Sequence, residues 1–407
     1  MKKALTIMLI LIFSLALIPL AFSGAKKEEL KVGTLMAHTG DLKEFGDNIR
    51  KGIALAAMQL GDAGLTIKLY EEDSETSPIP GVNAARKLVN INQVGAIIGG
   101  LSSGGSIAGA ESVTIPNNVI QISPASTSPL LSILPADQGK DFLFRTTPSD
   151  ALQGVVSGTE AAKLVKTASI LYTNNAYGQG LAQEFTKAFE ANGGKVLASV
   201  PHEQGQPSYA AELKKALAGN PQTIAAFSYP VSAVVYIKEA IELYNFKNFF
   251  YCDGTKSIDM IEALGADVLE GQMGTAAGSK GGKAKDLFVA AFEDEFGDLP
   301  PLPYIDNGYD AMAVLGLAAL AAKAKGLELT ATNIRDNLRE IAAPPGAVIL
   351  PGEFKKAADL LKKGQKINYE GASGSTDFDQ YGDVITPIEV WKFTNGTIER
   401  VKLVEVE

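Results

Sequence analysis

The stretch VGAIIGGLSSGGSIAG at residues 94–109 joins an apolar run to a loop of glycine and serine. We expect its apolar part, 94–100, to form a short buried strand, and we expect a helix over 106–118. A loop of small residues between a strand and a helix is typical of a parallel sheet with helices on its faces. The stretch therefore predicts an α/β protein, and it raises the question of what the loop binds.

The alternation of strands and helices extends along most of the chain. In the first part, strands are expected over 31–37, 65–73, 94–100 and 119–126, with helices over 45–61, 80–90 and 106–118. The alternation restarts after 142–150, with strands over 167–175, 195–203, 223–230 and 248–254 and helices over 177–194, 209–220, 232–244 and 257–265. Two doubly wound units explain this pattern most simply. Further helices are expected over 284–297 and 309–326, followed by a hairpin over 387–405 with a tight Asn-Gly turn.

The N-terminus has the pattern of a secretory signal peptide. Two lysines precede an apolar run, and Pro19 and a stretch of small residues follow it. We expect cleavage after Ser23 or Ala25. Retention as a membrane anchor is the alternative, because the run approaches the length that spans a bilayer. The sequence thus predicts an exported protein that works in the periplasm or elsewhere outside the cytoplasm.

The composition of the 407 residues argues against several classes of function. The net charge is −9, and no basic block is interleaved with aromatic residues, so nucleic acid is not a predicted partner. The chain has no Walker lysine and no G-x-G-x-x-G with a downstream acid, so phosphates and dinucleotides are not predicted ligands and no cofactor is expected. Cys252 is the only cysteine, so an intramolecular disulfide cannot form.

Residues 100–104, GLSSG, match the G-x-S-x-G pattern of serine hydrolases, in which Ser102 would be the nucleophile. Such a serine needs a base, which is nearly always a histidine. The sequence contains only His38 and His202, and neither has an evident partner. The second interpretation is a carboxylate site built from backbone N–H groups and serine hydroxyls at the start of a helix. The position of the loop, at the carboxyl end of a parallel strand, favours this interpretation over a hydrolase. An ordinary glycine-rich turn is the third possibility.

Several stretches together make the chain resemble the branched-chain amino acid binding proteins of ABC importers, which are type I periplasmic binding proteins. They lie at 32–56, 94–127, 144–150 (FRTTPSD), 170–185 and 378–383 (FDQYGD). The resemblance implies an α/β fold of two doubly wound parallel-sheet lobes, a three-crossover hinge and a ligand in the cleft between the lobes. The implied division is a signal peptide at 1–25, a first lobe of 26–145 plus 277–376, and a second lobe of 146–276 plus 377–407.

The resemblance assigns polar contacts in the first lobe to the loops after two strands. Ser103 would bind the α-carboxylate of the ligand, with Ser102 beside it. The carbonyl of Ala125 and the side chain of Thr127 would hold the ammonium and carboxylate groups. These assignments agree with the carboxylate interpretation of the glycine-serine loop.

In the second lobe the resemblance points to two tyrosines and an acid. Tyr177 would close over the ligand carboxylate, Tyr229 would stand at a strand end, and Asp253 would pair with the ammonium. Asp253 precedes a glycine, so a simple turn role is the alternative. The variable side chain of the ligand would be surrounded by Phe45, Leu101 and Tyr304.

The implied function is the binding of an L-amino acid with an aliphatic or other apolar side chain, by a monomer that closes its lobes and delivers the ligand to a membrane permease. No catalytic residue and no metal site are expected. A ligand-sensing protein of the same fold for a small amide or aromatic acid is the alternative, and a serine hydrolase is a more remote one. Leucine-type members of the family often have glutamate at the position of Asp253 and a first-lobe disulfide, and this chain also has a long extra stretch at 342–375.

Overall fold

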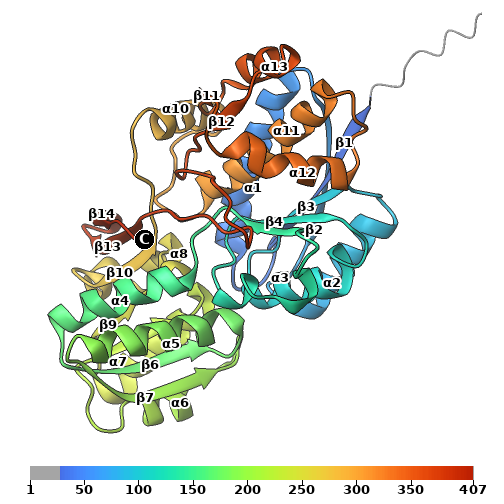
Figure 1. Ribbon diagram of the computed structural model, residues 1–407. Coiled ribbons are helices and arrows are strands. Elements are labelled where there is room, and N and C mark those ends of the chain that lie inside the picture. Colours follow the sequence, from blue (N-terminus) through green and yellow to red (C-terminus); the bar gives the residue numbers. More distant parts are fainter. Residues whose placement is uncertain (1–27, 407) are drawn as a thin grey trace, which may run out of the picture.

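The computed structural model describes residues 28–406, and it contains two large sheets covered by helices (Figure 1). The predicted signal peptide and its cleavage site lie outside the described residues. Over the described range, no helix combines the length and the apolar composition that crossing a bilayer requires.

The first sheet consists of five parallel strands in the order β2-β1-β3-β4-β5. Their bounds are Glu29–Met36 (β1), Thr66–Asp73 (β2), Ala96–Gly99 (β3), Ile120–Ser123 (β4) and Leu143–Arg145 (β5). The helices of this lobe are Lys43–Asp62 (α1), Pro78–Asn90 (α2), Ser103–Gly109 (α3), Lys283–Phe296 (α10), Ile305–Ala324 (α11), Ala331–Ala342 (α12) and Phe354–Lys362 (α13). Nearly every residue of α11 is buried, which agrees with its apolar sequence on all sides.

The second sheet has the order β14-β13-β10-β9-β8-β6-β7. Its strands are Thr167–Thr173 (β6), Lys195–His202 (β7), Thr223–Phe227 (β8), Phe249–Tyr251 (β9), Met273–Ala277 (β10), Ile388–Thr394 (β13) and Thr397–Val404 (β14). Its helices are Asp150–Leu164 (α4), Ala176–Ala191 (α5), Ala210–Ala216 (α6), Pro230–Tyr244 (α7), Ile258–Leu264 (α8) and Ala266–Leu269 (α9). The predicted hairpin is confirmed, and β13 joins β10 in antiparallel orientation.

The two sheets share one topology in their parallel parts, which determines where a ligand can bind. The order β7-β6-β8-β9-β10 repeats the order β2-β1-β3-β4-β5. In the first sheet β1 lies between β2 and β3, and in the second sheet β6 lies between β7 and β8. The helix that follows the first strand of each unit and the helix that follows its third strand therefore cover opposite faces of the sheet. A crevice forms at that point, outside the carboxyl ends of the strands. The predicted loops after β3 and β6 both lie at such points.

The chain passes between the lobes three times (Figure 1). The first crossing lies between β5 and α4, the second between β10 and α10, and the third between β12 (Ile367–Tyr369) and β13. The fold is therefore the predicted two-lobed α/β fold with three crossovers. We propose that the lobes divide as 26–145 plus 277–376 and 146–276 plus 377–407.

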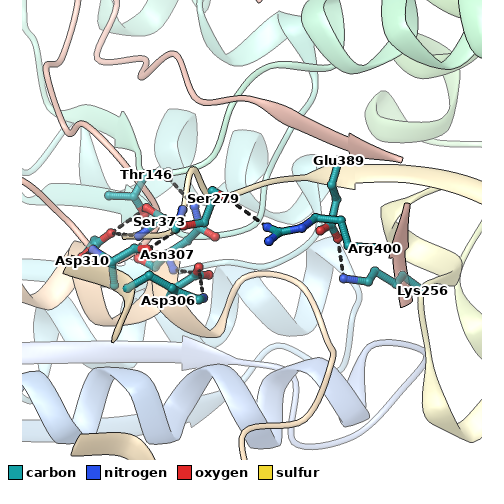
Figure 2. A network of polar contacts seen from close by, with 12 residues as sticks. Thr146, Lys256, Ser279, Asp306, Asn307, Asp310, Ser373, Glu389 and Arg400 are labelled. Atoms are coloured by element: carbon teal, nitrogen blue, oxygen red, sulfur yellow. Dashed lines mark hydrogen bonds and ion pairs between the residues drawn. The ribbon is translucent and has the colours of Figure 1, made fainter. Parts of the chain in front are cut away.

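Polar contacts tie the crossing segments to helix α11, and Figure 2 shows part of this network. After β5, the Thr146 hydroxyl donates to the Asn307 carbonyl at 2.8 Å. At the third crossing, Asp310 accepts hydrogen bonds from the backbone N–H groups of Ala372 (2.9 Å) and Ser373 (2.8 Å). At the second crossing, the Ser279 hydroxyl donates to the Ala372 carbonyl at 3.0 Å. The crossing segments therefore have defined conformations rather than behaving as free linkers.

Two local differences from the sequence expectation concern extra elements and a helix start. Helix α3 begins at Ser103 rather than at Ser106, and a single π-helical turn, Ala110–Thr114, follows it. The earlier start is shown by the first helical hydrogen bond, in which the Ser106 backbone N–H donates to the Ser102 carbonyl at 2.9 Å. The extra stretch at 342–375 forms α13 and a two-stranded parallel sheet of β11 (Ala347–Ile349) and β12.

Candidate functional site

A cavity lies between the lobes, at the carboxyl ends of the strands of both sheets. Its lining is largely aromatic and aliphatic, with a serine hydroxyl, tyrosine hydroxyls and one carboxylate. The residues that line it are Leu42, Phe45, Leu101, Ser103, Ala125, Tyr177, Tyr229, Asp253, Gly254 and Tyr304. Most of the residues that the sequence assigns to a ligand site therefore meet in one cavity. Ser102 and Thr127 do not line it.

The glycine-serine loop places one serine toward the cavity and one away from it. Ser102 precedes α3 in an extended conformation and is buried, with its side chain outside the cavity lining. The Ser103 side-chain oxygen accepts a hydrogen bond from the Ser128 backbone N–H at 3.1 Å. That bond uses a lone pair of the Ser103 oxygen, so its hydroxyl proton stays available for an acceptor in the cavity.

Phe45 and Tyr177 occupy equivalent positions in the two lobes, each in the first turn of the helix that follows the first strand of its unit. Each is followed by a glycine that packs against the end of that strand. A Cβ atom on Gly46 would lie 2.1 Å from the Ala37 carbonyl oxygen, and one on Gly178 would lie 2.2 Å from the Thr173 carbonyl oxygen. No side chain fits at either distance, so the glycines let the helix start close to the sheet and bring the aromatic rings to the cavity.

Asp253 follows β9 and is the acidic group of the cavity. Its side chain is buried, and three neutral donors point at it. They are the Gln153 amide (2.7 Å), the Tyr177 hydroxyl (2.9 Å) and the Tyr304 hydroxyl (2.7 Å). A carboxylate has about four lone-pair positions, so one remains for a donor on a ligand.

The electrostatics of this cluster follow from burial. Burial raises the pKa of Asp253, although the hydrogen bonds from Tyr304, Gln153 and Tyr177 oppose the shift. Burial and the nearby charge of Asp253 raise the pKa of Tyr177 and Tyr304 well above the ordinary tyrosine value. Both phenols therefore stay protonated at neutral pH and act as donors to Asp253.

The hydroxyl contacts add to two roles that the sequence assigns. Tyr177 is expected to bind the ligand carboxylate, and in the structure its hydroxyl lies within hydrogen-bond distance of Oδ1 of Asp253 (2.9 Å) and Sγ of Cys252 (3.0 Å), which share its single proton. Tyr304 is expected only beside the ligand side chain, but its hydroxyl also reaches Asp253 from the other lobe. Stacking of the Tyr177 and Tyr229 rings, with centroids 5.5 Å apart, adds a flat apolar wall. The Tyr304 contact has a geometric cause, because Tyr304 and Asp253 belong to different lobes and only the closed arrangement brings them together.

Contacts across the cleft show that the lobes are closed against each other. Glu44, in the first turn of α1, accepts a hydrogen bond from the Ile258 backbone N–H at 2.9 Å and bonds the Ser257 hydroxyl at the start of α8. Asp41 accepts a hydrogen bond from the Ser232 hydroxyl at 3.0 Å. Burial raises the pKa of both carboxyl groups. These contacts and the Tyr304–Asp253 bond join the two lobes around the cavity.

The histidines of the chain are engaged away from Ser102. The Nε2 atom of His202 lies 2.9 Å from the Ser228 hydroxyl, and its Nδ1 atom lies 3.0 Å from the Glu203 carbonyl. The Nδ1 atom of His38 lies 3.9 Å from Asp47. The predicted nucleophile thus has no histidine as a hydrogen-bond partner in the part of the chain that the structure describes. Within residues 28–406, no group of three or more His, Cys, Asp or Glu side chains is placed to hold a metal ion.

Sequence reasoning did not identify Leu42 and Gly254, which also line the cavity, or Gln153 and Asp150, which lie behind it. Asp150 ends the FRTTPSD stretch and begins α4, next to its N-cap Ser149. The N-cap residue Ser149, which follows β5, could have identified Asp150. A helix that begins after a parallel strand begins at the same sheet edge as the other ligand-binding loops. The hydrogen-bond partners of these residues depend on the packing of the lobes.

Comparisons with known proteins agree with this geometry. The model of a family described as periplasmic binding protein matches residues 29–367. The chain is 27% identical over 354 residues to the chemotactic signal transduction system substrate-binding protein BasB of Halobacterium salinarum, covering 85% of this chain and 81% of that protein. It is 25% identical over 394 residues to the leucine-, isoleucine-, valine-, threonine-, and alanine-binding protein of Pseudomonas aeruginosa, covering 94% and 95%.

Solved structures have the same fold. The leucine binding protein LivK of Thermotoga maritima superposes with a TM-score of 0.77 at 25% identity, over 92% of this chain and 99% of that one. A solute binding protein of an ABC transporter from Rhodopseudomonas palustris, in complex with benzoate, superposes with a TM-score of 0.73 at 19% identity, over 93% and 98%. The second likeness concerns the fold alone.

Proposed function

Since the chain belongs to the periplasmic binding protein family, we propose that it is the extracytoplasmic solute-binding protein of an ABC importer. In this proposal it binds an L-α-amino acid with an apolar side chain as a monomer and delivers it to a membrane permease. The predicted signal peptide supports export. The amino-acid-binding relatives from Pseudomonas aeruginosa and Thermotoga maritima support the ligand class. No covalent step is part of this function.

The observation that carries the proposal is a cavity with a free donor on one lobe and a carboxylate on the other. An amino acid is a zwitterion, so both of its charges need partners when water is removed. The Ser103 hydroxyl can donate to the α-carboxylate, and the remaining lone-pair position of Asp253 can accept from the ammonium. The carbonyl of Ala125 adds a further acceptor on the first lobe.

The rest of the cavity favours an apolar side chain on the ligand. Leu42, Phe45 and Leu101 come from the first lobe and are buried, and all three line the cavity. Placing an aliphatic side chain against them removes apolar surface from water, which stabilises the complex by about 25 cal/mol per Å². A charged side chain would lose its hydration there without gaining a partner.

Lobe closure follows from the distribution of these partners. A ligand that bonds Ser103 and Asp253 at once gains both contacts only when the lobes are closed. It therefore binds the closed form more tightly than the open form, and this difference in affinity shifts the hinge equilibrium toward closure. A permease that recognises the closed form would then distinguish loaded from empty protein.

A thermal-shift screen of L-amino acids, small amides and aromatic acids tests the ligand class. We expect at least one amino acid with an apolar side chain to raise the melting temperature, because a ligand that binds only the folded state stabilises it. At a concentration of 100 Kd the stabilisation is about 2.7 kcal/mol. A shift with benzoate and none with any amino acid at millimolar concentration would contradict the amino-acid assignment.

The adjacent serines provide a second test. We expect Ser103→Ala to weaken amino-acid binding by about 1–3 kcal/mol, since the ligand carboxylate would lose a hydrogen bond. Ser102→Ala is the matched control and should have a smaller effect, because Ser102 does not line the cavity. Isothermal titration of both variants measures the difference. The reverse order, or ester hydrolysis abolished by Ser102→Ala, would instead support the hydrolase hypothesis.

A sensing role is the second candidate, and one relative favours it. The Halobacterium salinarum protein is a substrate-binding protein of a chemotactic signal transduction system. In a sensing role this chain would bind its ligand in the same cavity, but a receptor would recognise the closed form. Uptake of the bound amino acid by vesicles that contain a candidate ABC permease distinguishes the two roles. A chemotactic response without uptake would favour sensing.

A further inference from the structure

Glu44, in the first turn of α1, forms its side-chain hydrogen bonds with the second lobe. Its carboxylate accepts hydrogen bonds from the backbone N–H groups of Ile258 (2.9 Å) and Asp259 (3.4 Å). The Ser257 hydroxyl donates a third bond to it. Among the described residues, every hydrogen bond of this carboxylate therefore crosses the cleft, and each one joins two protein groups without the help of a ligand.

The first lobe holds the loop before α1 in position by itself. Asp73, at the end of β2, accepts hydrogen bonds from the backbone N–H groups of His38 (2.9 Å) and Thr39 (3.3 Å). The Leu42 backbone N–H donates to the Thr76 hydroxyl at 3.1 Å. These contacts lie within the first lobe, so they do not depend on closure. The loop is therefore already in place when the second lobe approaches, and little ordering is needed at that moment.

On the second lobe, the segment that meets Glu44 also carries the acidic group of the cavity. Lys256 lies between Asp253 and Ser257 in the chain, and it makes a buried ion pair with Glu389 of β13 (Figure 2). This ion pair fastens the segment to the second sheet. A movement that brings Ser257 to Glu44 therefore also brings Asp253 to the first lobe.

Hydrogen bonding rather than charge holds the lobes together at this contact. Burial raises the pKa of Glu44, and the nearby charge of Asp259 raises it further, so a negative charge is not favoured there. A backbone N–H can donate to a neutral carbonyl oxygen as well as to a carboxylate. A glutamine in place of Glu44 can therefore accept from Ile258 through its carbonyl oxygen and donate to the Ser257 hydroxyl through its amide.

We propose that Glu44 is a positioning residue that latches the two lobes together independently of the ligand. Asp41 contributes less, because it accepts a single bond, from the Ser232 hydroxyl at 3.0 Å. The inference goes beyond the proposed function, since it predicts that part of the protein is closed before any ligand binds. Leu42 and Phe45 of the same loop line the cavity, so one short segment supplies both cavity wall and latch. A ligand that is retained only in the closed form then leaves more slowly when the latch is intact.

Small-angle X-ray scattering of the ligand-free protein tests the latch without any assumption about the ligand. Dialysis from guanidinium chloride removes ligand that is carried through purification. We expect Glu44→Ala to have a larger radius of gyration than the wild type, because opening of the hinge extends the molecule. Glu44→Gln should keep the wild-type radius. Asp47→Ala is the matched control and should also keep it, because it removes a carboxylate of the same helix that pairs with Lys43 of its own lobe.

L-leucine serves as the probe that separates the latch from the ligand contacts. At saturation, Glu44→Ala should return to the radius of the loaded wild type, because the ligand contacts then close the lobes. Its L-leucine dissociation, measured by stopped flow, should be about tenfold faster, the effect of losing hydrogen bonds in the closed form. Ser257→Ala should also speed dissociation in the wild type, but it should add little in the Glu44→Ala background.

The scattering and binding results have separate consequences. Equal radii of the ligand-free wild type and Glu44→Ala would overturn the latch, whatever ligand the cavity takes. A ligand-free Glu44→Gln that opens as far as Glu44→Ala would overturn the assignment to hydrogen bonding. If no amino acid binds but the ligand-free radii differ as expected, the proposed function is wrong and the latch stands.

Discussion

Replacing Asp253 by asparagine is expected to weaken amino-acid binding by roughly tenfold to several hundredfold. The Asp253 side chain is buried, and Gln153, Tyr177 and Tyr304 already donate to it. An asparagine keeps the shape and one acceptor oxygen but loses the charge that faces the ligand ammonium. Leaving one member of a buried charge pair without its partner costs about 3–5 kcal/mol, and the remaining acceptor moderates this loss.

The control for this variant is a ligand without the ammonium. Binding of the matching carboxylic acid should be unchanged or slightly improved in Asp253→Asn, because the buried charge that disfavours it is gone. Titration of both ligands against both proteins measures the effect. Wild-type affinity of Asp253→Asn for the amino acid would mean that Asp253 is only a turn residue before Gly254 or that the ligand carries no ammonium. The amino-acid assignment would then be wrong, while the two-lobed fold would be unaffected.

Arg145→Leu is expected to lower the free energy of unfolding by about 3–5 kcal/mol. The Arg145 side chain is 1% exposed and makes a two-pronged ion pair with Asp383, at 2.8 and 2.7 Å. It also donates to the carbonyl of Ser128 at 3.0 Å. A leucine fills part of the volume but leaves the carboxylate of Asp383 without its cation. Because Asp383 lies on the third crossing segment, the variant should also loosen the connection between the lobes.

The matched control is Arg339→Leu, which removes a similar but exposed ion pair. Arg339 contacts Asp141 through both terminal nitrogens, and about a third of each side chain is exposed. Exposed pairs contribute about 0–1 kcal/mol, so this variant should change the stability little. Urea unfolding monitored by circular dichroism compares the two. Equal destabilisation by both substitutions would contradict the difference that burial is expected to make.

The contents of the cavity were largely predictable, but the roles of its members were not. The positions of Ser103 and Tyr177 follow from their place after predicted strands, because the carboxyl ends of parallel strands share one edge of the sheet. A hydroxyl has several possible partners, however, and its choice depends on which of them the fold brings within about 3 Å. The Thr127 hydroxyl therefore could not be assigned to Asp150 from the sequence, nor the Tyr304 hydroxyl to Asp253.

The two-lobed architecture was already contained in local patterns. Apolar runs such as 94–100, glycines at the ends of predicted helices and the restart of the alternation after 142–150 each depend on neighbours within a few residues, so the sequence expresses them directly. The partners of the two buried carboxylates are distant in the sequence. Thr127 lies 23 residues from Asp150, whereas Gln153 and Tyr304 lie 100 and 51 residues from Asp253. Only the crossings and the closure of the lobes bring such distant groups together, and burial then sets the charge that the cavity can accept.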